Sequence, residues 1–271
     1  MLITSHPSEN DFIETNESNS KEDAIVLIVD DNKDILNLLQ ASLNTHYNVI
    51  SAINGKIGIE KAIENIPDVI ISDVMMPEKN GFELCKTLKN DERTSHIPII
   101  LLTAKASDQD KIRGLSNGAD AFITKPFNKA ELFIRIQELI KLRTLLYQKY
   151  NSASSWDAIP NKDLEDKDAT FMNKVLFHIE QHIEDASFNS MRLSRELNLS
   201  ESQLYRKLKA TTNASTAVFI RRVRLQKAKT ILQNSEYTIS EIAYQTGFNS
   251  PGWFSRAFKD EFGYPPNEMR K

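Results

Sequence analysis

The sequence predicts two domains of different class, an α/β domain on a parallel sheet followed by an all-α domain. Between residues 25 and 140, short β-branched runs alternate with amphipathic stretches, as strand–helix–strand units do. After residue 167 the apolar spacing is that of short helices, and no stretch has a convincing strand pattern. A chain of 271 residues is long for one domain and comfortable for two.

The first half contains five predicted βα units, which give a flavodoxin-like fold. The strands that can be located are Ile25–Val29, Val69–Ser72, Ile99–Leu102 and Ala121–Thr124. Helices are expected near Ile35–Leu43, Lys56–Glu64, Gly81–Lys89 and Asp108–Asn117, with a last one after Asn128. Asn128 suits an N-cap, and the apolar residues after it share one stripe: Leu132, Ile136, Leu139 and Ile140.

The polar stretch 147–167 is predicted to be a linker between a domain at 24–146 and another at 168–271. It is rich in Ser, Asn, Asp and Lys. Residues 1–23 are polar and acidic, so we expect a disordered tail or the remnant of an upstream segment. The helices expected in the second domain are Phe171–Glu184, Ser190–Leu197, Ser200–Ala210, Ala217–Gln233, Ser240–Thr246 and Pro251–Phe262.

The net charge of −3 conceals an uneven distribution. Residues 167–271 hold 16 Lys and Arg against 11 Asp and Glu, and residues 1–166 hold the other 18 and 26. This asymmetry suggests that the basic domain meets a polyanion, although a basic face can also be merely solvated. Cys85 is the only cysteine, which excludes an intramolecular disulfide and favours a reducing compartment. No stretch approaches the roughly 20 apolar residues of a membrane span, so we expect a cytoplasmic chain without direct membrane contact.

Acidic residues, a threonine and one lysine follow the predicted strands. Asp30 and Asp31 end the first strand, and Asp73, Thr103 and Lys125 end later ones at successive intervals of 42, 30 and 22 residues. A βα unit takes about 30 residues, so these side chains should meet at the carboxyl edge of a parallel sheet. An acidic crevice with a single cation suits a divalent metal such as Mg²⁺ and a phosphoryl group.

The sequence motifs around these residues resemble those of the receiver domain of two-component response regulators, and the resemblance extends over about residues 25–141. They are Val29-Asp30-Asp31-Asn32, Asp73-Val74-Met75-Met76-Pro77, Leu102-Thr103-Ala104 and Lys125-Pro126-Phe127. The resemblance implies Asp73 as phosphoacceptor, with Mg²⁺ held by Asp30, Asp31, Asp73 and the Met75 carbonyl. It also implies that Thr103 and Lys125 contact the phosphoryl group, that Phe122 is the switch aromatic, and that the Lys125–Pro126 bond is cis. An aromatic in a strand is more often a core residue, so that alternative stays open for Phe122.

The second half contains one arrangement twice, a short helix, a tight turn and a second helix. Leu193–Ser200 and Gln203–Leu208 form the first unit, and Ile239–Phe248 and Trp253–Lys259 form the second. Arg206 and Arg256 occupy equivalent points, 50 residues apart. Apolar residues on one face of each second helix are expected to pack against the first helix of its unit. The opposite face is polar and basic, as a recognition helix requires in the major groove.

The segment from about 170 to 271 resembles the AraC/XylS-type DNA-binding domain, most closely in Ile239–Phe262 with Gly263-Tyr264-Pro265-Pro266. By position, the resemblance implies DNA contacts from Ser202, Tyr205 and Arg206 in the first unit and from Trp253, Ser255 and Arg256 in the second. Each arginine could equally contact phosphate or form a surface ion pair. Asn213 and Thr216 depart from the family pattern, but Asn tolerates a left-handed backbone, so that turn can survive.

Together the two resemblances predict a DNA-binding response regulator that accepts phosphate on Asp73 from a histidine kinase. Its expected partners are double-stranded DNA, the kinase and a second copy of the chain when phosphorylated, with RNA polymerase as a further candidate. The dimer face is expected around Asp108–Asn117, Ala121–Thr124 and Asn128–Ile140. The same order of domains resembles the C-terminal end of hybrid two-component sensors, in which case the chain would be tethered to the inner membrane.

Two alternatives come from other classes of protein. The chain could be a phosphorelay receiver that stores or passes phosphate without specific DNA binding. It could also be a small-molecule phosphatase, since such enzymes form aspartyl phosphates. Met75 stands two residues beyond Asp73, where the best-known aspartyl-phosphate hydrolases have a second aspartate, so we expect a regulator and not an enzyme.

Overall fold

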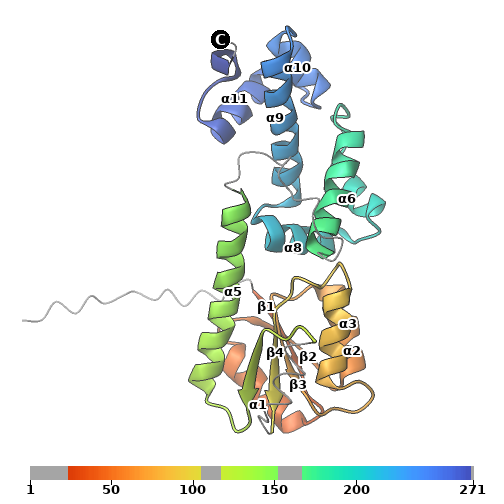
Figure 1. The fold of residues 1–271 in the computed structure, drawn as a ribbon, viewed down its shortest axis with the longest axis vertical. Helices are drawn as coiled ribbons and strands as arrows, with labels where there is room; N and C mark the ends of the chain where they lie inside the picture. The colour runs from red at the N-terminus through yellow and green to blue at the C-terminus, as the bar shows by residue number, and fades with distance from the viewer. Residues whose placement is uncertain (1–23, 105–116, 152–166, 270–271) are drawn as a thin grey trace, which may run out of the picture.

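A computed structural model of the chain describes residues 24–104, 117–151 and 167–269 (Figure 1). The predicted helix at Asp108–Asn117, part of the expected dimer face, lies almost entirely outside the described residues. Within the described part of the chain, no helix has the length and apolar character needed to cross a membrane.

The first domain is built on a five-stranded parallel sheet. Its strands are β1 (Ile25–Val29), β2 (Asn48–Ala52), β3 (Val69–Asp73), β4 (Ile99–Thr103) and β5 (Ala121–Thr124), in the order β2-β1-β3-β4-β5. Every neighbouring pair is parallel, which requires a crossover between strands. The predicted flavodoxin-like fold and the four located strands are thereby confirmed; β2 is the strand to which the sequence pattern assigned no residues.

Helices cover both faces of the sheet, and successive strand residues point to opposite faces. The helices are α1 (Lys33–Leu43), α2 (Gly55–Asn65), α3 (Gly81–Asn90) and α5 (Lys129–Asn151). Leu27 and Val29 pack with α2 and α3, and we call this cluster the α2/α3 core. Val26 and Ile28 pack with α1 and α5 on the other face. The Asn128 side chain accepts a hydrogen bond from the Ala130 N–H, so it caps α5 as expected.

The second domain consists of helices arranged as two similar units. They are α6 (Lys167–Gln181), α7 (Ser190–Glu196), α8 (Glu201–Thr212), α9 (Thr216–Asn234), α10 (Ile239–Gln245), α11 (Pro251–Phe262) and a 3-10 turn, η2 (Pro266–Met269). The long helix α9 joins two separate cores: its first half packs with α6, α7 and α8, and its second half with α10 and α11. The second domain is therefore an all-α domain with two helix-turn-helix units, as predicted.

The two units start their second helices at equivalent residues. Ser200 caps α8 by accepting from the Gln203 N–H, and Ser250 caps α11 by accepting from the Trp253 N–H. These caps lie 50 residues apart, which places Arg206 and Arg256 at the same helical position. Asn213 ends α8 in the left-handed conformation, with φ of 52°, as the sequence predicted for this turn.

Candidate functional site

The carboxyl ends of the strands bring two buried carboxylates and one lysine together. Lys125 Nζ lies 2.8 Å from Asp30 Oδ2 and 2.7 Å from Asp73 Oδ1. The Asp30 side chain is 1% exposed and the Asp73 side chain 10%. A shared ammonium group therefore neutralises part of a paired acidic charge that water reaches poorly.

The environment shifts the ionisation of both groups. Burial raises the pKa of the Asp73 carboxyl above its ordinary value, and the nearby Asp30 charge adds to this, while Lys125 and the Met75 N–H oppose it. Burial alone would lower the pKa of Lys125, but its hydrogen bonds to Asp30 and Asp73 raise it above the ordinary value. Lys125 is therefore a permanent cation beside a carboxylate that is poorly solvated.

The turn after β3 is held tightly against the strand end. The Met75 N–H donates to Asp73 Oδ2 at 3.1 Å, and the Gly81 N–H donates to the Val74 carbonyl at 2.9 Å. A Cβ on Gly81 would lie 2.3 Å from the Asp73 carbonyl oxygen, so only glycine fits here. This close approach fixes the backbone that carries Asp73.

Thr103 and Phe122 lie on the neighbouring strands. Thr103 ends β4 and is 6% exposed, and its carbonyl accepts from the Lys125 N–H at 2.7 Å. Phe122, on β5, is partly buried and packs against the α2/α3 core. The Lys125–Pro126 bond is cis, as the resemblance implied.

The metal set expected from the sequence is only partly assembled. Asp31 is exposed, and no three acidic, histidine or cysteine side chains of the described residues are grouped closely enough to hold a metal ion. Instead the Lys125 ammonium group lies between the two buried carboxylates. Three carboxylates and one lysine nevertheless leave the crevice with a charge of about −2, and hard oxygen donors suit Mg²⁺ chemically.

The residues expected to contact DNA fall on α8 and α11, which Figure 1 shows at different distances from the first domain. Ser202 and Tyr205 are exposed on α8, and Trp253 and Arg256 are exposed on α11. Ser255 is partly buried. The Trp253 ring packs against Phe248, with 5.0 Å between ring centroids, so the turn of the second unit supports it.

Arg206 differs from Arg256 in its surroundings. Its guanidinium donates to the Asn65 carbonyl of the first domain at 2.5 Å. Two residues that the sequence did not single out, Gln203 and Lys207, also bond to that domain. Lys207 shares a helix face with apolar Leu204 and Leu208, a spacing that could have singled it out, whereas the polar character of Gln203 gave no such signal.

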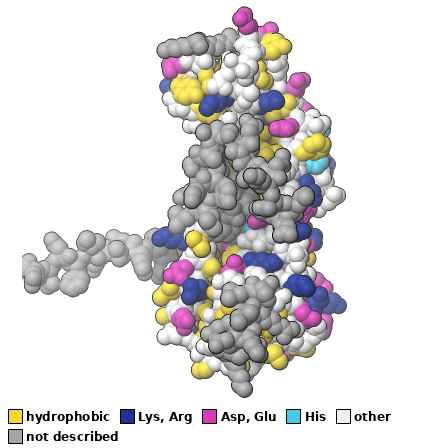
Figure 2. Space-filling model, viewed as in Figure 1, with side chains coloured by type: hydrophobic (Ala, Val, Ile, Leu, Met, Phe, Trp, Pro, Cys, Tyr) yellow, Lys and Arg dark blue, Asp and Glu magenta, His cyan; other side chains and the backbone are white. Residues whose placement is uncertain are grey.

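A hollow of about 420 Å³ opens beside these residues. Several helix starts meet there, and it is lined by Ser190, Glu201, Ser202, Tyr205, Arg206, Ser215, Thr216 and Ala217. Helix N-termini carry unpaired N–H groups and partial positive charge, which suit a phosphate. On the face drawn in Figure 2, basic side chains are interspersed with acidic ones and form no single basic patch.

Comparison with known proteins identifies both halves. Residues 26–137 match the response regulator receiver domain, and residues 193–271 match a helix-turn-helix domain. The chain joins a response regulator receiver domain to a helix-turn-helix domain. The receiver match covers the carboxylate–lysine crevice, and the helix-turn-helix match covers α8 and α11.

The relatives match either most of this chain or less than half of it. "Histidine kinase P4" of Formosa agariphila is 38% identical over 251 residues, which cover 92% of this chain and 18% of that protein. "Response regulator PleD" of Caulobacter vibrioides is 40% identical over 45% of this chain and 27% of its own length. The "DNA-binding dual master transcriptional regulator RpaA" of Synechocystis sp. is 40% identical over 43% of this chain and 48% of its own. The chain thus spans about a fifth to a half of these relatives.

Proposed function

We propose that the chain is a phosphorylation-dependent transcription regulator, in which Asp73 accepts a phosphoryl group from a histidine kinase and thereby changes DNA binding by the helix-turn-helix domain. The observation that carries the proposal is the buried Asp73–Lys125–Asp30 arrangement in a receiver domain, in one chain with two recognition-type helices. The similarity to a histidine kinase over 92% of this chain supports a kinase as phosphoryl donor.

Each residue of the crevice has a part in the proposal. Asp73 presents a poorly solvated carboxylate oxygen for in-line attack on the phosphorus of a phosphohistidine. The new O–P bond forms as the P–N bond breaks, and the histidine imidazole is the leaving group. Lys125 moves from the two carboxylates to an oxygen of the phosphoryl group, and the Thr103 hydroxyl donates to another. Mg²⁺, when bound by Asp30, Asp31, Asp73 and the Met75 carbonyl, would neutralise charge on the phosphoryl oxygens.

DNA recognition is assigned to the two units of the second domain, with domain boundaries near 24–146, 147–167 and 168–271. Ser202, Tyr205 and Arg206 on α8 and Trp253, Ser255 and Arg256 on α11 are the proposed contacts. Two such helices about 34 Å apart reach successive major grooves on one face of the duplex. We also propose a cytoplasmic location and dimerisation on phosphorylation, which raises affinity through effective concentration.

The test is a selection of genomic DNA fragments by the purified chain, with and without beryllofluoride and Mg²⁺. Asp73→Asn removes the acceptor without changing size, and Asp34→Asn makes the same change at an exposed carboxylate of α1. A repeated site whose enrichment rises with beryllofluoride in the wild type and in Asp34→Asn, but not in Asp73→Asn, supports the proposal. Absence of any specific enrichment contradicts it and favours a phosphorelay receiver.

A further inference from the structure

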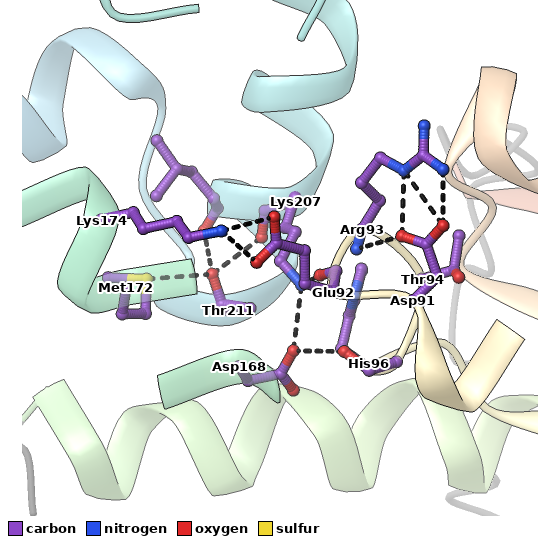
Figure 3. Close-up of polar contacts among 12 residues, drawn as sticks. Asp91, Glu92, Arg93, Thr94, His96, Asp168, Met172, Lys174, Lys207 and Thr211 are labelled. Atoms are coloured by element: carbon purple, nitrogen blue, oxygen red, sulfur yellow. Dashed lines mark hydrogen bonds and ion pairs between the residues drawn. The ribbon is translucent and has the colours of Figure 1, made fainter. Parts of the chain in front are cut away.

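The first recognition helix, α8, is docked on the receiver domain. Gln203 Nε2 donates to the Ile63 carbonyl at 2.8 Å, and Arg206 donates to the Asn65 carbonyl at 2.5 Å. Lys207 Nζ donates to the Glu92 carbonyl. These receiver groups, together with the segment Asp91–His96 between α3 and β4, form what we call the docking surface. Figure 3 shows the part of it around Glu92 and His96.

Like a nucleic acid, the docking surface presents α8 with several hydrogen-bond acceptors in a region of negative electrostatic potential. Ile63 and Asn65 lie in the last turn of α2, where carbonyls lack partners within the helix and the helix dipole is negative. The last turn of α2 contains no basic residue of its own. Arg206 therefore supplies from the other domain the cation that this helix end lacks.

Lys207 shows that this contact is specific. Its side chain is 1% exposed, and a buried ammonium group is costly unless it is paired and hydrogen-bonded. Its partners come from both domains: the Glu92 carbonyl of the receiver, Asp168 Oδ1 of α6 at 3.0 Å, and the face of Phe171 at 4.6 Å. Separation of the domains would leave Lys207 its ion pair with Asp168 but remove the hydrogen bond to the Glu92 carbonyl.

Further polar pairs hold the same junction. Lys174 of α6 forms an ion pair with Glu92 at 2.8 Å, and Ser95 donates to Asp168 at 2.9 Å. These contacts are polar and are made by side chains and carbonyls, as is common at separable interfaces between domains. Such a junction can open and let each group return to water or to another polyanion.

We propose that the docking surface competes with DNA for α8, so that the chain as seen here is a closed state able to read DNA with α11 alone. The proposal deepens the function proposed above and rests on it. Arg206 is engaged by the receiver, whereas its counterpart Arg256 is exposed. Figure 1 shows α8 facing the receiver and α11 at the far end of the molecule. Opening releases the first unit and allows both helices to contact successive grooves.

The docking surface is separate from the phosphoacceptor. It is formed by segments that precede β3 and β4, whereas Asp73 ends β3. A five-residue strand spans about 17 Å, so a change at the docking surface leaves the crevice intact. This separation allows the closed state to be altered without touching the proposed acceptor or the proposed DNA contacts.

The test reverses the Lys174–Glu92 ion pair in the full chain. Glu92→Lys and Lys174→Glu each place like charges across the junction, and the double variant restores an opposite pair with the charges exchanged. DNA binding is measured by fluorescence anisotropy on the most enriched fragment from the genomic selection, without beryllofluoride. Small-angle X-ray scattering of the same samples reports whether the two domains separate.

The closed state predicts that each single variant is more extended and binds DNA about two- to five-fold more tightly, the factor expected for a partly exposed ion pair. The double variant should return to wild-type size and affinity. Opposite charges again face each other across the junction in this variant, and it is this attraction, whichever residue carries which sign, that favours docking. Single variants that expand without gaining affinity, or a wild type already as extended as the variants, overturn the proposal. If no variant, open or closed, binds any fragment specifically, it is the proposed function that fails.

Discussion

Replacing Lys125 by methionine tests whether the crevice is held by one shared cation. The substitution keeps the length of the aliphatic side chain and removes the ammonium group that lies 2.8 Å from Asp30 and 2.7 Å from Asp73. Removing one partner of a buried ion pair costs about 3–5 kcal/mol, because the remaining charge is left without compensation. Lys125 itself is 20% exposed, so we expect the lower end of this range, about 3 kcal/mol.

This loss of stability should depend on pH in a defined direction. The folded-state pKa of Asp73 is raised by burial above the ordinary value of 3.8, and Lys125 is the main group that opposes the rise. Without Lys125 the folded-state pKa rises further. A carboxyl whose folded pKa exceeds its unfolded pKa favours the folded state when protonated, so the variant regains stability as the pH falls through that raised pKa towards 3.8.

Thermal unfolding of the full chain by differential scanning calorimetry at pH 8 and pH 5 measures both effects. At roughly 4 °C per kcal/mol, the receiver transition of Lys125→Met should lie about 12 °C below that of the wild type at pH 8, and the difference should shrink at pH 5. Lys129→Met, at an exposed position of α5, is the control and should change little. A difference below about 3 °C at pH 8 would refute the shared-cation argument.

Two further predictions concern the cores. Burial raises the pKa of Cys85 to about 12, so only about one thiol in 10⁴ is ionised at pH 8, and a disulfide reagent should label the native chain slowly and the urea-unfolded chain at once; rapid stoichiometric labelling of the native chain would contradict its burial. Phe254 is fully buried in the core of the second unit, so Phe254→Ala should cost about 3–5 kcal/mol in urea unfolding, whereas Phe177→Ala, at a 57% exposed ring, should cost less than about 1 kcal/mol.

The sequence predicts most of what local rules control. Strand ends are marked by a change from β-branched residues to Asp30 and Asp73, and the parallel arrangement then brings them together. Helix starts are similarly visible, since Ser200 and Ser250 are residues that favour N-caps, and both cap helices in the structure. The boundaries of α8 and α11 follow from these residues almost without tertiary information.

The contacts between domains could not be predicted in this way. Lys207 falls on the same face of α8 as apolar Leu204 and Leu208, but a lysine is ordinarily solvated. Its burial depends on Glu92 and Asp168, which are 115 and 39 residues away. The position of the Lys125 ammonium group between Asp30 and Asp73 was unpredictable for a similar reason, because it is a property of the packed site and not of spacing.

The proposed phosphoacceptor, Asp73, and the docking surface are connected through one packed layer. Val74, directly after Asp73, belongs to the α2/α3 core, and Phe122 and Met76 pack against it. The same core includes Ala62 and Ile66 at the end of α2 and Leu88 near the end of α3, next to the groups that hold Arg206 and Lys207. Close-packed cores shift between discrete arrangements and deform little continuously. A phosphoryl group that draws Lys125 and Thr103 towards Asp73 would change the space open to Phe122, and repacking of this layer is then the shortest physical route by which α8 could be released.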